Sequence, residues 1–517
     1  MFQSILYESL QDIPANEVPQ SMDCLKDLNL DQIFTSIIKS TNTFDLSQVL
    51  YRPLTSASAV IYRQEIMRDF DTAETYELFL EFSRRLHALE QDMAAVQKDL
   101  TDPNGFNYDD ATKSCCLEYA DRYRDSVSKV GSEAEKLPIH SRGLRSFLEY
   151  LSDYCHSTGF QTMCDEIDYL KSGFAAIHFC IRIKNGTIYV RPYEGQDDLN
   201  PSIAALFSRF QQKDMEPQRR EHPQAYTAHH IDAAILSLLS HWHKELFAEL
   251  DRFVQKHLYF LDDVIVRFSK EVHFYLSWHH YIAPLQQSRL PFCYPQICDD
   301  TAQLHCTGGF DLALAKVLSF KGQTPVTNDF CLKAPEQMIV VTGPNQGGKT
   351  TFARAFGQLF YLASLGCSVP GSSAAVYLPD RIYTHFSREE DLSTLNGKLQ
   401  DDLLRLHDIL VHAGERSLLI INEIFSSTTL QDALFLGRHM VEQIVHLGCP
   451  AVCVTFLDEL ASYDEHTVSM MSTVNKTDPT IRTYKVIRKS ADGLAYAAHI
   501  AKKYHLTDQD LSGRLQK

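Results

Sequence analysis

A glycine-rich stretch between two regular elements constrains the fold of this chain more than any other feature. Residues 343–350 read GPNQGGKT and match the pattern G-x-x-x-x-G-K-[ST]. The β-prone run 338–342 precedes the stretch, and a helical pattern over 352–365 follows it. In such a strand–loop–helix unit the loop N–H groups face phosphate oxygens. The sequence therefore predicts an α/β sheet that binds a nucleoside triphosphate.

Most of the predicted contacts to the nucleotide come from this loop. Lys349 is expected to reach the β and γ phosphate oxygens, Thr350 to ligate Mg²⁺, and the helix N-terminus to add a field that favours an anion. We therefore predict ATP and Mg²⁺ as cofactors and Lys349 as a catalytic residue. The predicted nucleotide-binding residues of the loop are Gly343, Pro344, Asn345, Gln346, Gly347, Gly348, Lys349, Thr350 and Thr351.

A second apolar run, residues 418–421, is typical of a buried strand and ends in Asn422 and Glu423. In ATPases of this general kind the strand ends in an acidic pair. The first residue holds Mg²⁺ through water, and the second polarises the attacking water. Glu423 is therefore predicted to be the general base; the alternative is a carboxylate that only makes a salt bridge. Asn422 can accept a hydrogen bond from a metal-bound water, but it brings no charge.

The rest of the sequence predicts an α+β protein of several domains. A chain of 517 residues has room for about three. We expect an N-terminal segment over 1–44, an all-helical core and lever domain over 45–290, and an α/β P-loop ATPase domain over 291–517. Within the helical domain, residues 177–191 predict a small β-hairpin, because Asn185-Gly186 between β-prone runs favours a tight turn.

A long helical pattern with few Gly or Pro residues extends from about residue 229 to residue 284. A single helix of ~50 residues would measure on the order of 75 Å, too long for a compact core, and so favours a lever. The alternative is two or three shorter helices whose breaks the pattern does not reveal.

Charge and composition limit the partners that this chain can have. It carries 49 Lys and Arg against 66 Asp and Glu, a formal charge of −17. This excludes a protein that is basic over its whole surface, so any contact with nucleic acid must be local. The 13 cysteines form no C-x-x-C pair, which favours reduced thiols. Because no apolar run approaches ~18 residues and no signal-peptide pattern is present, we expect a cytoplasmic protein with no membrane partner.

Several motifs together resemble the MutS family of DNA mismatch-repair ATPases. The loop, with Thr342 before it, differs little from the family's TGPNMGGKS. The likeness is strong over about 338–460 and moderate over 45–80. The other matching segments are 365–370 (G-C-x-V-P in the family), 380–384 (D-R-I-F-T), 415–423 (the Walker B block) and 52–54 with 62–65 (the opening of the helical core).

The resemblance implies a helical core and lever followed by an ATPase domain of the ABC/MutS type. It also implies an ATP-gated homodimer, joined through the ATPase domains, that closes its levers on DNA in repair or recombination. Only about 45 residues precede the core, so it implies a member without the N-terminal mismatch-recognition domain. Asn328 and Arg488 match segments beside the adenine and are further candidate contacts. Arg182, Lys184 and Arg191 are candidates for touching nucleic acid; the alternative is a purely structural hairpin.

Some positions depart from the family pattern. Asn422 replaces the acidic Walker B residue, and Phe456, which cannot hydrogen-bond a γ-phosphate, replaces the switch histidine. The signature S-T-F-x-x-E-M aligns with 397–403, where Lys398 is a candidate for contacting the partner's nucleotide. These differences predict slow hydrolysis rather than loss of ATP binding. Two alternatives remain: a nucleotide-switched scaffold that holds a protein partner, and a MutS-type ATPase that acts on RNA or ribosomes.

Overall fold

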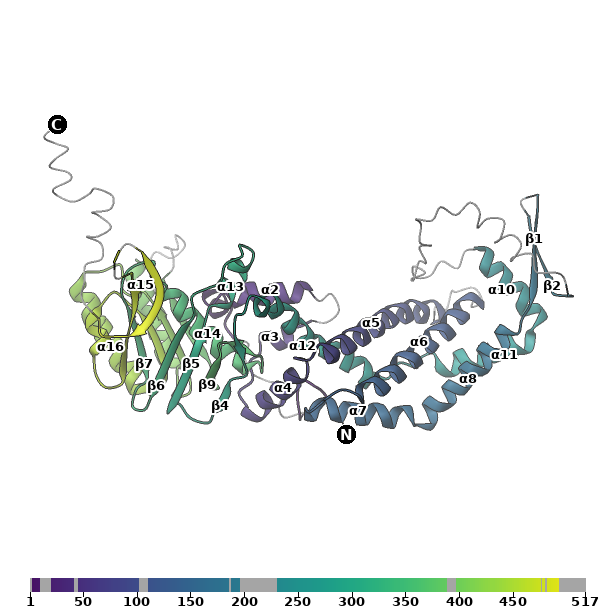
Figure 1. Cartoon of the computed structure of the whole chain (residues 1–517), viewed down its shortest axis with the longest axis horizontal. Helices are drawn as coiled ribbons and strands as arrows, with labels where there is room; N and C mark the ends of the chain where they lie inside the picture. Colours follow the sequence, from purple (N-terminus) through teal and green to yellow (C-terminus); the bar gives the residue numbers. More distant parts are fainter. Residues whose placement is uncertain are drawn as a thin grey trace, which may run out of the picture. The chain divides into compact units, whose positions relative to one another are not determined.

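The structure is a computed structural model, shown in Figure 1, and it divides into two compact units. The helical unit comprises Glu77–Leu137 and Ser146–Lys270. The sheet unit comprises Phe2–Tyr76, Pro138–Arg145 and Glu271–Lys517. The described residues are 2–9, 20–40, 45–101, 110–185, 187–195, 230–387, 397–475, 477–478 and 481–491.

This division differs from the predicted boundaries near residues 45 and 291, because residues 2–76 belong with the sheet. Buried side chains of α14 (Lys349–Ser364) hold this segment by its backbone. Gln358 Nε2 donates to the carbonyl oxygen of Leu28 at 2.8 Å, and the Tyr361 hydroxyl donates to that of Leu50 at 2.9 Å. The helices of this segment are α1 (Met22–Asp27), α2 (Leu30–Ser40), α3 (Ser47–Leu50) and α4 (Ala57–Asp69).

Long amphipathic helices and a hairpin make up the helical unit. Phe268 lies at its aromatic core, where its ring contacts those of Phe79, Phe82 and Phe147. The division between the units falls within α5, α7 and α12. The helices are α5 (Ala73–Thr101), α6 (Asp110–Ala134), α7 (Arg142–Cys155), α8 (Thr158–Ala175), α10 (His230–Trp242), α11 (Lys244–His257) and α12 (Asp263–Gln287).

The single long helix over 229–284 is a wrong prediction, and the alternative of shorter helices is confirmed. The segment contains α10, α11 and α12, with breaks at His243 and at residues 258–262. At the second break the Asp262 carboxylate accepts hydrogen bonds from the backbone N–H groups of Val264 and Ile265, both at 3.0 Å. Such a side-chain cap starts a new helix without Gly or Pro. The sequence pattern therefore did not reveal this second break.

The predicted hairpin is confirmed. Strands β1 (Phe179–Lys184) and β2 (Thr187–Pro192) pair antiparallel, and Asn185 has a φ of 53° at the turn. Arg182 pairs with Tyr189 and Arg191 with Cys180, so these four residues share one face. The exposed Arg182 and Arg191 stay candidates for contact with nucleic acid, which nothing in the structure tests.

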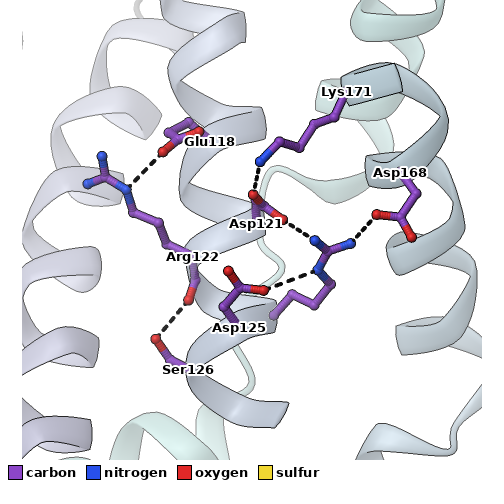
Figure 2. A network of polar contacts seen from close by, with 8 residues as sticks. Glu118, Asp121, Arg122, Asp125, Ser126, Asp168 and Lys171 are labelled. Carbon is purple, nitrogen blue, oxygen red and sulfur yellow. Dashed lines mark hydrogen bonds and ion pairs between the residues drawn. The ribbon is translucent and has the colours of Figure 1, made fainter. Parts of the chain in front are cut away.

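A network of ion pairs joins α6 to α8 in the helical unit (Figure 2). Asp121 is almost fully buried and accepts hydrogen bonds from Lys171 on α8 and from Arg124 on its own helix. Arg124 Nη1 also donates a hydrogen bond to Asp168 Oδ1 of α8 at 2.5 Å. Figure 2 also shows Arg122 paired with Glu118 along α6. The buried carboxylate therefore ties two helices together through two cations.

The sheet unit is built on a six-stranded sheet in the order β10-β11-β12-β7-β13-β14. Its first five strands are parallel, and β14 runs antiparallel to β13. The buried strands predicted over residues 338–342 and 418–421 are thereby confirmed as β7 and β11, which lie on either side of β12. The strands are β7 (Met338–Thr342), β10 (Ile382–Phe386), β11 (Leu418–Asn422), β12 (Ala451–Val454), β13 (Thr467–Val474) and β14 (Arg482–Arg488).

Helices cover both faces of this sheet. On one face α15 (Lys398–His412) and α16 (Leu430–Leu447) form a continuous apolar core with β7, β11 and β12. On the other face lies α14, which also contacts a four-stranded sheet in the order β4-β9-β5-β6 and is buried along most of its length. The fold class predicted in its broad form, a helical region with an α/β sheet domain, is confirmed.

The remaining short elements of the sheet unit complete this arrangement. They are β3 (Phe292–Cys293), β4 (Gln296–Cys298), β5 (Gln303–Gly309), α13 (Leu312–Ser319), β6 (Asn328–Lys333), β8 (Val369–Pro370), β9 (Ser373–Tyr377) and the 3-10 helix η2 (Asp458–Ser462). Within the described part of the chain, no helix has both the length and the apolar character that crossing a membrane requires.

Candidate nucleotide site

The glycine-rich loop joins the end of the buried strand β7 to the start of α14. Gly343 and Gly348 have φ values of 108° and 92°, a region that favours glycine. A Cβ on Gly343 would lie 2.7 Å from Ser472 Oγ, and one on Gly347 would lie 2.5 Å from the same atom. Strand β13 therefore supports the loop so closely that both positions require glycine.

Lys349 is the first residue of α14 and lies 5% exposed under the loop. Its Nζ donates to the carbonyl oxygens of Gly343 at 2.9 Å and Pro344 at 3.3 Å, and to Asn345 Oδ1 at 3.3 Å. Burial lowers the pKa of Lys349, and the Glu423 carboxylate partly offsets this effect. The ammonium is thus held by neutral oxygens, which phosphate oxygens could replace.

The two predicted metal-binding residues lie side by side. Thr350 Oγ1 donates a hydrogen bond to Asn422 Oδ1 at 3.0 Å. Asn422 is 7% exposed and ends β11, between Phe386 of β10 and Val454 of β12. Hydroxyl and amide oxygens are suitable ligands for Mg²⁺ or its waters, although neither carries charge.

Glu423, the predicted base, follows at once with a φ of 55°. Its backbone N–H donates to the Val454 carbonyl oxygen at 2.9 Å, which fixes this unusual conformation. Glu423 lines a cleft of about 860 Å³ beside the loop. The cleft is lined by Leu314, Leu318, residues 322–326, Asn328, residues 346–351, Glu423 and Tyr484.

The two predicted adenine contacts have different places. Asn328 lines the cleft, and its Oδ1 accepts a hydrogen bond from the Val486 N–H at 2.7 Å. Arg488 instead pairs with Glu336, an ion pair that raises the pKa of the arginine, and it is not among the residues that line the cleft. Tyr484, which sequence reasoning missed, lies there instead and is 53% exposed. An aromatic residue on the last strand was the available signal.

Two buried hydroxyls beneath the loop have no hydrogen-bond partner within the described ranges of the chain. They belong to Thr342, which ends β7, and Ser472 on β13. Both residues are fully buried. Buried hydroxyls without a partner are uncommon in native proteins.

Comparisons with known proteins bear on this part of the chain. Residues 339–511 match the family model described as MutS domain V. This chain is a MutS-family protein. The predicted resemblance is thereby confirmed, and the matched MutS domain includes the loop, Asn422, Glu423 and Tyr484.

Three curated relatives are each named DNA mismatch repair protein MutS. That of Thermotoga petrophila is 26% identical over 273 residues, which are 52% of this chain and 32% of the relative. That of Bacillus licheniformis is 26% identical over 268 residues, or 51% and 30%. That of Chlorobaculum parvum is 30% identical over 216 residues, or 41% and 24%. The chain therefore spans a third or less of the length of these MutS proteins.

The other positions that depart from the MutS pattern lie around the same sheet edge. Phe456 is 49% exposed and follows the buried Thr455, whose N–H donates to the Val341 carbonyl oxygen at 3.1 Å. Lys398 begins α15. None of these contacts tests whether the residues take part in hydrolysis or contact the nucleotide of a partner subunit.

Proposed function

We propose that this chain is an ATP-binding, MutS-like ATPase of the ABC/MutS P-loop type that hydrolyses ATP slowly. The observation that carries the proposal is the buried Lys349, whose ammonium lies under a loop in which Gly343 and Gly347 leave no room for a Cβ. In this role Lys349 binds the β and γ phosphates, and the loop N–H groups of 345–350 orient them. Thr350 and Asn422 would hold Mg²⁺ or its waters, and the bound ion would supply positive charge beside the phosphates.

Glu423 is proposed as the general base that orients and deprotonates the attacking water. Its place at the cleft and its fixed backbone support this role. Asn422 contributes no charge to the metal, and Phe456 offers no hydrogen bond to a γ-phosphate. We expect slow hydrolysis from these two departures from the family pattern, because Lys349 is then the main protein group that stabilises charge in the transition state.

On the whole protein, we propose a homodimer joined through the sheet units that binds DNA and closes on it when ATP binds. The family and the names of the relatives support a role in DNA repair or recombination. A steady-state ATPase assay with homoduplex, mismatched and junction DNA tests this role. Stimulation by RNA alone would instead favour the RNA or ribosome alternative.

The nucleotide assignment is tested with Lys349→Ala. Loss of the cation that contacts the loop oxygens should abolish ATP binding, measured with a fluorescent ATP analogue. Lys321→Ala, an exposed lysine next to the cleft residue Gly322, is the matched control and should bind normally. Intact affinity in Lys349→Ala would contradict the proposal.

A second candidate function is a nucleotide-switched scaffold that holds a protein partner with little hydrolysis. The neutral pair of Thr350 and Asn422 favours it, because a weakly held metal slows turnover but permits binding. Tight ATP binding with no measurable phosphate release, with or without DNA, would select this function over the ATPase.

A further inference from the structure

The contact between Thr350 and Asn422 makes each residue the other's partner. The Thr350 hydroxyl donates to the Asn422 amide oxygen at 3.0 Å, in a place where Asn422 is only 7% exposed. Strands on both sides of β11 hold the Asn422 backbone in register. The pair therefore offers a cation two neutral oxygens and no carboxylate.

Charged groups of both signs act on the loop lysine. The carboxylates of Glu423 and Asp458 favour the Lys349 ammonium, and the positive charge of Arg482 disfavours it. Asn422 adds no charge to this set, whereas a carboxylate at position 422 would add a negative one. Such a carboxylate would repel the phosphates unless a divalent cation came between them.

We propose that Asn422 uncouples ATP binding from Mg²⁺, so that this site binds free ATP and MgATP with similar affinity. The inference rests on the proposed function and extends it to the form of the nucleotide that the site accepts. Because coupling between two ligands is reciprocal, a protein that gains little ATP affinity from Mg²⁺ also adds little to the affinity of the bound ATP for Mg²⁺. The Thr350 hydroxyl then orients Asn422 in addition to offering an oxygen to the cation.

The test compares ATP affinities by calorimetry in excess EDTA and in excess Mg²⁺. For the natural protein the two dissociation constants should agree within about tenfold. For Asn422→Asp, the affinity for free ATP should fall by about tenfold or more, because the new carboxylate faces the phosphates without a counter-ion. Its affinity for MgATP should be equal to that of the natural protein or tighter.

Thr350→Val provides a second variant, in case Asn422→Asp fails to fold. Loss of the hydroxyl should lower the affinities for free ATP and for MgATP by the same factor. A selective loss of affinity for MgATP would overturn the inference. The inference would also be overturned if the natural protein bound MgATP but showed, in EDTA, an affinity for free ATP as low as that of Asn422→Asp. If the natural protein binds neither form, the proposed function itself fails, and the two failures are thus distinguishable.

Discussion

Glu423 combines a left-handed backbone with a side chain at the cleft, and this position predicts the effect of its replacement. Glu423→Gln keeps the shape and the backbone bond to Val454 but removes the proton acceptor. Turnover should fall by about 10²- to 10⁴-fold, while the dissociation constant for ATP stays the same. Single-turnover phosphate release measures the first quantity, and calorimetry the second. An unchanged rate would assign the base to another residue.

The buried ammonium of Lys349 predicts a pH dependence of ATP binding. Because burial lowers its pKa, Lys349 loses its proton at a lower pH than an exposed lysine does. Phosphate oxygens favour the charged form of Lys349, so ATP binding should take up protons as the pH rises toward the pKa of this lysine. The affinity for ATP should decline as the pH passes that pKa. Calorimetry between about pH 8 and 10 in buffers of different ionisation enthalpy measures this uptake. Proton release, or none, would contradict it.

At the scale of whole elements, sequence patterns correctly predicted the turns and strands that depend on contacts between neighbouring residues. The hairpin turn at Asn185 and the strand that ends at Asn422 follow from a few neighbouring residues, and both are confirmed. The break before α12 was missed because a single side chain, Asp262, caps the helix. The cleft contact of Tyr484 and the pairing of Arg488 with Glu336 depend on strands far apart in sequence, whose register no local pattern predicts.

The segment 2–9 is a further element that only the structure revealed. Glu271 of α12 accepts hydrogen bonds from Ser4 Oγ and from the Ile5 N–H, each at 2.9 Å, and Ile5 is fully buried. Glu271→Ala leaves these donors unsatisfied and should destabilise the sheet unit by about 1–3 kcal/mol. Thermal unfolding followed by circular dichroism measures this loss. Glu8→Ala, which removes only a surface ion pair to Arg142, is the control and should change little.

At the scale of the whole molecule, two compact units predict two separate unfolding events. Asp121→Ala leaves the cations of Arg124 and Lys171 without their buried carboxylate, so the helical unit should lose about 1–2 kcal/mol, a modest cost because Lys171 is half exposed. ATP at about 100 times its dissociation constant should stabilise the sheet unit by about 2.7 kcal/mol. Differential scanning calorimetry should therefore show one transition that the substitution lowers and another that ATP raises, with unchanged ATP affinity in Asp121→Ala. A single transition that responds to both would mean that the helical unit and the nucleotide site unfold as one cooperative body.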